Sequence, residues 1–170
     1  TTTANAARVM SHMEFCHQAL WPSLDVQYVS VTEQWAQMAV AGPKARATLQ
    51  KIVDGITLDD ETFPYLAAKE IAVLRCIPAR LFRISFSGEE GYEIAVPTRY
   101  GEALFRDLLA RAETMGGGPY GMEALNVLRI EKGFITHAEI HGRISAHDIG
   151  MEKMVSAKKD CIGKSAATRP

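Results

Sequence analysis

A glycine-bounded turn between two alternating apolar runs, at residues 79–96, constrains the fold of this chain more than any other feature. The alternating apolar positions are Phe82, Ile84 and Phe86 before the turn and Tyr92, Ile94 and Val96 after it. A period of two predicts two strands, and the polar turn at 88–91 predicts that they pair as a hairpin. We therefore expect these six side chains to form one apolar surface, with Glu93 on the opposite face beside Arg83.

Glu93 is a carboxylate inside the second predicted strand, where it is costly unless it faces water, an opposite charge or a ligand. One interpretation is a cross-strand ion pair between Glu93 and Arg83 on a solvated face. The other is a ligand site, because a carboxylate accepts two parallel hydrogen bonds from adjacent N–H donors. A guanidinium presents such donors, and so does the amino-pyrimidinone edge of a pterin. The residues alone favour the ion pair and leave the ligand site open.

Periodicity predicts an α+β fold, an antiparallel sheet with helices packed on one face. Helices are expected over 3–20, 43–53, 100–115 and 121–131, and strands over 26–31, 34–40, 70–76, 79–86 and 92–96. The helix at 100–115 is the clearest, because its apolar residues form one stripe. Antiparallel strand neighbours with helices interleaved between them favour this layered arrangement over a parallel sheet.

Charge and cysteine content exclude several classes of protein. A formal net charge of −1 argues against a nucleic-acid groove or a polybasic membrane surface. The three cysteines are far apart and match neither a zinc spacing nor a disulfide framework, which predicts a reducing compartment such as the cytoplasm. No apolar run reaches the ~18 residues that a membrane-spanning helix needs.

Four segments, in order along the chain, resemble the folate-binding aminomethyltransferase family. The hairpin F-S-G-E-E-G-Y-E-I at 86–94 is similar to the family's S-[FY]-[ST]-G-E-x-G-[YFW]-E hairpin. The other matching segments are 35–43, 120–133 and 139–148. The family includes the T-protein of glycine cleavage and the folate domains of enzymes that oxidise sarcosine and dimethylglycine. The form Y-G-x-E-A-x-x-V-L-R-x-E-K-G is closest to the sarcosine-oxidising branch.

The resemblance implies a pterin site on the hairpin. It makes Glu93 the carboxylate that binds the pterin of tetrahydrofolate, and Phe86 an aromatic wall of the same site. Phe86 is predicted on the face opposite to Glu93, so a bulge at the glycines has to reconcile the two. Tyr92 and Arg83 are further candidates for cofactor binding, with core packing as the alternative for Tyr92. Arg129, in the L-R-x-E motif, is expected to form a structural ion pair or cap.

The implied parent activity is oxidative demethylation of sarcosine to glycine, hydrogen peroxide and 5,10-methylenetetrahydrofolate. FMN, FAD and NAD are implied for other parts of the parent complex, and its other subunits are the implied partners. The family's reaction-centre aspartate lies upstream of this sequence, so no catalytic residue is assigned. We expect a piece of a longer protein without turnover of its own. Residues 1–134 are expected to be the folate domain and 135–170 an extended segment leading towards a C-terminal barrel.

Three alternatives remain open. The first is an aminomethyltransferase of glycine cleavage, disfavoured because Leu125 replaces an arginine of that branch. The second is the folate domain of a dimethylglycine dehydrogenase or oxidase, and the third is a scaffold of the same fold that binds no folate. A metal site is not expected: His137, Glu139 and His141 would share one side of a strand, but the family has no metal there.

Overall fold

The structure of the chain is a computed structural model that describes residues 3–156 and 158–167. The first two residues of the predicted domain, 1–2, and the last three of the predicted C-terminal segment, 168–170, lie outside the described residues. The chain divides into two compact units, Thr1–Gly121 and Met122–Pro170. Each unit is described by itself, and the predicted limit after residue 134 stays a prediction.

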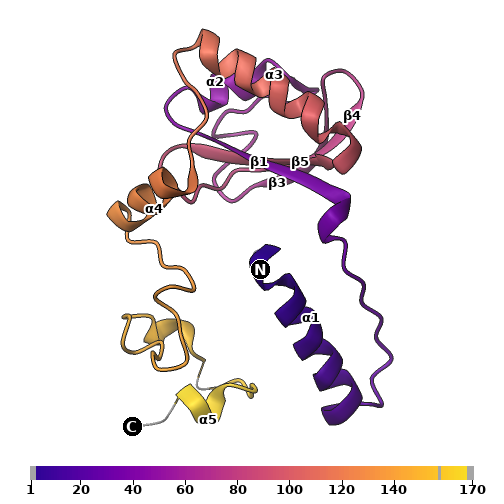
Figure 1. Ribbon diagram of the computed structural model, residues 1–170, viewed down its shortest axis with the longest axis vertical. Coiled ribbons are helices and arrows are strands. Elements are labelled where there is room, and N and C mark those ends of the chain that lie inside the picture. The colour runs from indigo at the N-terminus through magenta and orange to yellow at the C-terminus, as the bar shows by residue number, and fades with distance from the viewer. Residues whose placement is uncertain (1–2, 157, 168–170) are drawn as a thin grey trace. The chain divides into compact units, whose positions relative to one another are not determined.

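A five-stranded antiparallel sheet is the centre of the first unit (Figure 1). Its strands are β1 (Trp35–Ala41), β2 (Val53–Asp54), β3 (Ala68–Val73), β4 (Ile77–Phe82) and β5 (Gly91–Pro97). The order across the sheet is β1-β5-β4-β3-β2, and every neighbouring pair is antiparallel. The predicted α+β class with an antiparallel sheet is confirmed, and β5 lies between two strands rather than at an edge.

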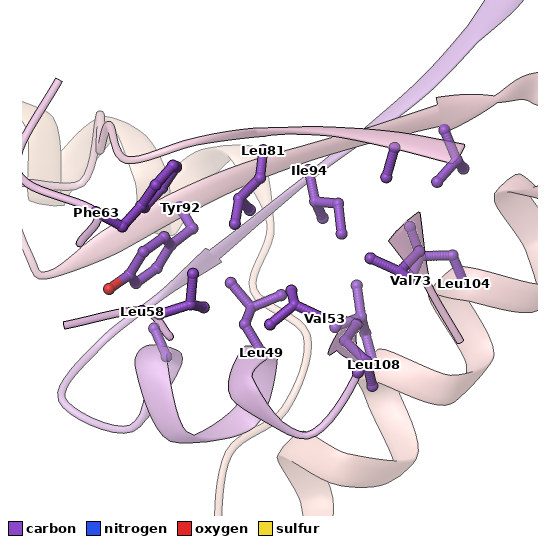
Figure 2. Close-up of a cluster of buried hydrophobic side chains, with 14 residues drawn as sticks. Leu49, Val53, Leu58, Phe63, Val73, Leu81, Tyr92, Ile94, Leu104 and Leu108 are labelled. Atoms are coloured by element: carbon purple, nitrogen blue, oxygen red, sulfur yellow. The ribbon is translucent and has the colours of Figure 1, made fainter. Parts of the chain in front are cut away.

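Helices α2 (Ala45–Gln50) and α3 (Gly101–Thr114) cover one face of this sheet (Figure 1). Alternate residues of β5 point into the core between the sheet and these helices, and Leu104 and Leu108 of α3 meet them there (Figure 2). Other labelled members of the core are Leu49, Val53, Leu58, Phe63, Val73, Leu81, Tyr92 and Ile94. Burial of this apolar surface, at about 25 cal/mol per Å², is what fixes the orientation of β5.

Two glycines let neighbouring segments pack closely: Gly91 of β5 against Ser85, and Gly101 of α3 against Ala36 of β1. A Cβ added at Gly91 would lie 2.7 Å from the Cβ of Ser85, and one added at Gly101 would lie 2.6 Å from the Cβ of Ala36. Real Cβ atoms do not come this close, so both positions require glycine. Gly91 thereby sets where β5 begins, two residues before Glu93.

The strand register corrects the predicted faces of the hairpin. Phe82 pairs with Glu93, and Leu81 pairs with Ile94, so Phe82 lies on the face of Glu93 and Leu81 lies in the core. The predicted surface of six apolar side chains is therefore wrong. The structural strand is Ile77–Phe82, and the residues that follow it lie outside the strand. Ala79 and Leu81 are the residues of β4 that are buried in the core, so the larger side chain of Phe82 lies on the opposite face.

The other predicted elements are mostly confirmed. The N-terminal helix consists of a 3₁₀ turn (Thr3–Asn5), α1 (Ala6–Phe15) and a π-helical turn (Cys16–Leu20). The prediction of a strand at 26–31 is wrong, because that segment forms no ladder and most of its residues are exposed. A short 3₁₀ turn (Thr32–Gln34) precedes β1, and another (Thr98–Tyr100) precedes α3.

The second unit begins with α4 (Met122–Glu131), which confirms the helix predicted over 121–131. Beyond it lie a 3₁₀ turn (Glu152–Met154) and the short helix α5 (Lys164–Ala167). Among the described residues, no helix is long and apolar enough to span a lipid bilayer.

Candidate functional site

The face of the sheet opposite to α2 and α3, here called the open face, carries Glu93. Side chains alternate along a strand, so the register places on this face every second residue of β1, β4 and β5. These residues are Trp35, Gln37 and Ala39 of β1, Arg80 and Phe82 of β4, and Glu93 and Ala95 of β5. Sequence reasoning was right that Glu93 and Ala95 face away from the core, because Tyr92, Ile94 and Val96 are buried.

Gln37 is the hydrogen-bond partner of Glu93. Its Nε2 donates to Oε2 of Glu93 from the neighbouring strand, where Glu93 pairs with Ala39 and is therefore a diagonal neighbour of Gln37. An ionised carboxylate only accepts hydrogen bonds, so the amide nitrogen has to face it. Within residues 3–156 and 158–167, no hydrogen bond to Oε1 of Glu93 is found. The carboxylate is thus held from one side and open on the other.

Arg83 does not pair with Glu93, so the predicted cross-strand ion pair is wrong. Its Nη2 lies 2.6 Å from Oδ1 of Asp60, and its Nη1 donates to the carbonyl oxygen of Phe63 at 2.8 Å. The physical reason is the register: Phe82 lies on the face of Glu93, so Arg83, the next residue, points to the opposite side, where its guanidinium reaches the loop at 59–63.

Tyr92 and Arg83 instead belong to a charged cluster at one end of the sheet, here called the Arg46 cluster. It consists of Arg46, Asp60, Arg83, Glu90 and Tyr92. Arg46 lies 2.7 Å from Asp60 and 2.6 Å from Glu90, and its Nε donates to the hydroxyl of Tyr92 at 3.2 Å. Arg83, and then Arg46, hold the pKa of Asp60 below its usual range. Burial raises the pKa of Tyr92. Cofactor binding by Tyr92 and Arg83 stays a prediction.

Phe86 lies in the segment that joins β4 to β5, outside either strand. Its side chain is 38% exposed. The expected bulge would have had to interrupt a strand, but Phe86 belongs to no strand, so strand alternation does not decide which face its side chain lies on. A role for Phe86 as a wall of the pterin site stays a prediction.

Tyr120 is a residue near Glu93 that sequence reasoning did not select. The residue is 42% exposed, and the pKa of its hydroxyl is raised first by the partial burial of that group and second by the negative charge of Glu93. Tyr120 opens the Y-G-x-E-A motif, which served only to identify the family. Tyr120 could have been selected by its residue type, because a tyrosine combines an aromatic ring with a hydrogen-bond donor.

Trp35 and Arg80 form a wall further along the open face. The guanidinium of Arg80 lies 4.1 Å from the centroid of the Trp35 ring, and its Nε donates to Glu70 at 3.2 Å. Arg80 pairs in register with Ala95, whose exposed fraction is only 4%. The open face thus combines a fixed carboxylate with aromatic and cationic neighbours, a composition suited to a flat polar ligand.

Arg129 of α4 has the structural role that was expected. It is buried, and its Nη1 donates to the carbonyl oxygen of Phe134 at 3.1 Å and to Oε2 of Glu139 at 2.8 Å. The backbone N–H of Thr136, followed by Arg129, lowers the pKa of Glu139 to about 2. The segment that carries His137 and His141 is a series of turns rather than a strand, and Glu139 is held by Arg129. No group of three potential metal ligands occurs among the described residues.

The fold and the site together define a mixed α+β domain with a carboxylate on the open face of an antiparallel sheet. Residues 1–159 match the family model described as the GCVT N-terminal domain, and the chain belongs to that family.

The chain is 57% identical to the sarcosine oxidase subunit alpha of Rhizobium meliloti (strain 1021), over 99% of this chain and 17% of the relative. Identity to mouse mitochondrial dimethylglycine dehydrogenase is 33%, over 84% of this chain and 16% of the relative. An aminomethyltransferase of Thermoanaerobacter sp. (strain X514) is 29% identical, over 84% of this chain and 38% of the relative. The chain thus spans less than a fifth of the first two relatives.

Proposed function

We propose that the open face binds the pterin ring of tetrahydrofolate, with Glu93 as the carboxylate that receives its amino-pyrimidinone edge. The observation that carries this proposal is the state of Glu93. It lies on a central strand, Gln37 orients it, and no cation pairs with it in the part of the chain that the structure describes. A buried or half-buried charge without a counterion is costly, which favours a ligand that supplies N–H donors.

The surroundings of Glu93 support a flat, aromatic ligand. The ring of Trp35 lies on the open face beneath the guanidinium of Arg80, and the charge of Glu93 contributes to raising the pKa of Tyr120. The strand holds the carboxylate more rigidly than a loop would, as a binding site requires. When bound, tetrahydrofolate would supply N5 and N10 as acceptors of a one-carbon unit, and this chain would hold its pterin edge in place.

The similarity to sarcosine oxidase alpha subunits supports a further proposal, that this site serves the oxidative demethylation of sarcosine to glycine, hydrogen peroxide and 5,10-methylenetetrahydrofolate. We propose that FMN, FAD and NAD act elsewhere in the parent complex, that its other subunits are the partners, and that it works in the cytoplasm. We assign no catalytic residue to this chain and expect no turnover from it alone. The dimethylglycine dehydrogenase and aminomethyltransferase activities of its other relatives are weaker candidates, because the identities are lower.

Titration calorimetry with tetrahydrofolate tests this proposal. The chain is expected to bind tetrahydrofolate, and Glu93→Gln is expected to weaken binding by about tenfold to a hundredfold, because charge-assisted hydrogen bonds are lost. The matched control is Glu102→Gln, which removes the same charge from the exposed surface of α3. Equal heats for the wild-type chain and Glu93→Gln would contradict the pterin role of Glu93. No binding to either would favour a scaffold that keeps the fold without folate.

A further inference from the structure

Gln37 presents more than the one N–H that it gives to Glu93. A glutamine amide has two N–H donors and an oxygen with two lone pairs. Only one N–H is used, to Oε2 of Glu93. Among the described residues, no donor reaches Oε1 of Gln37, and this side chain is exposed on the open face. Its acceptor therefore lies next to the carboxylate and is available to a ligand.

Glu93 and Gln37 together form a surface rich in acceptors. The carboxylate has about four lone-pair positions, and the hydrogen bond from Gln37 occupies one. The amide oxygen of Gln37 adds a further acceptor on the same planar group that fixes Oε2. Two donors of a ligand can reach the carboxylate, and a third donor beside them can reach Gln37.

We propose that Gln37 is a specificity-determining residue that reads the exocyclic amino group of the ligand. An amino-pyrimidinone edge has three N–H donors: the ring N–H, and two on the amino group. The ring N–H and one amino N–H bind Glu93, and the second amino N–H donates to Oε1 of Gln37. This inference rests on the proposed function, because it names which ligand atom each side chain contacts.

The consequence is selectivity for ligands with an unsubstituted amino group. A ligand with an oxygen in place of that group would leave the acceptors of Glu93 and Gln37 facing another acceptor, which is repulsive. A ligand with a methyl group on the amino nitrogen would keep the two bonds to Glu93 and lose the bond to Gln37. Methylation therefore separates the contribution of Gln37 from that of Glu93.

Calorimetry on the whole chain with two probes tests the inference: 6-methyltetrahydropterin and its derivative with one methyl group on the exocyclic amino nitrogen. The wild-type chain is expected to bind the methylated probe about fivefold to tenfold more weakly, as the loss of one hydrogen bond predicts. In Gln37→Met both probes should bind with equal affinity, because the side chain that distinguishes them is gone. Gln34→Met, in the 3₁₀ turn before β1, is the matched control and should keep the wild-type ratio.

A second variant, Gln37→Glu, keeps an acceptor and removes the donor to Glu93. Two carboxylates in contact share a proton, so binding should strengthen as the pH falls, whereas wild-type binding should change little over the same range. This change in pH profile tests the contact between residue 37 and Glu93, and the methylated probe tests the contact between Gln37 and the ligand.

The results distinguish failure of this inference from failure of the proposed function. If the wild-type chain binds neither probe, the proposed function is wrong and the inference with it. If binding depends on Glu93 but the methylated probe is penalised equally in the wild-type chain and Gln37→Met, only the inference is overturned. The inference would also be overturned if the effect of Gln37 on binding depended on the ring carbonyl oxygen of the ligand and not on its amino group.

Discussion

The two faces of β5 differ in almost every physical respect, although their residues alternate one by one. Tyr92, Ile94 and Val96 are each at most 1% exposed and pack under α2 and α3. Glu93 and Ala95 face the other way, towards Gln37 and Arg80. The core face holds the strand in position, and the open face can therefore carry a charge that contributes little to folding. Substitutions on the core face should therefore cost more stability than substitutions on the open face.

Ile94→Ala should have the largest effect. Ile94 is fully buried and pairs with Leu81 of β4 and Met38 of β1, so its truncation leaves a cavity in the centre of the sheet. We expect a loss of about 2–5 kcal/mol in the free energy of unfolding. Urea unfolding followed by circular dichroism measures it. A loss below about 1 kcal/mol would show that the core face does not hold β5.

Arg83→Met should have an intermediate effect, because Arg83 joins the segment after β4 to the loop at 59–63. Its side chain is 13% exposed, and the variant keeps most of its apolar length. Loss of the ion pair to Asp60 and of the hydrogen bond to the carbonyl of Phe63 should cost about 1–3 kcal/mol. The same unfolding experiment measures the cost, and Arg106→Met, on the exposed face of α3, is the control.

The effect of Arg83→Met should depend on pH with a defined sign. The pKa of Asp60 is lowered in the folded chain, so Asp60 stabilises the fold above its ordinary pKa of 3.8. This contribution is lost as the pH falls from there through the lowered pKa. The difference in stability between the wild-type chain and Arg83→Met should therefore narrow towards strongly acid pH, down to the part that the hydrogen bond to the carbonyl of Phe63 contributes. A difference that stayed constant across this range would contradict the ion pair.

The sequence predicted elements well where one pattern sufficed. The stripe containing Leu104 and Leu108 predicted α3, because helical spacing places these residues on one face whatever surrounds them. It predicted the face of β4 incorrectly. The run at 79–86 contains two alternating sets of apolar residues, one with Ala79 and Leu81 and one with Phe82. The larger side chain of Phe82 suggested that its set faces the core, but the other set does. Only the register with β5 decides between them.

The same limitation explains which site residues could be found. Glu93 stood out as a carboxylate within a strand, and the family resemblance gave it a ligand. Gln37 did not stand out, because a polar residue in an alternating strand is ordinary until its neighbour is known. The approach of Tyr120 to Glu93 depends on the path of the chain after α3, which no local pattern determines. Arg83 was assigned to Glu93 because the register, which pairs Phe82 with Glu93, could not be read from the sequence.

Glu93→Gln should have the smallest effect on stability, and it is the variant that most directly tests the contrast between the two faces. Glu93 forms no ion pair with the described residues, and an amide of the same shape can still accept from Gln37. We expect the free energy of unfolding to stay the same or to rise by less than about 0.5 kcal/mol, because the variant removes a charge that has no counterion. Urea unfolding of Glu93→Gln beside Ile94→Ala, one residue away on the opposite face, measures the difference. If Glu93→Gln were to lower stability by several kcal/mol, the carboxylate would be a structural group, and its loss of tetrahydrofolate binding would no longer identify a ligand contact.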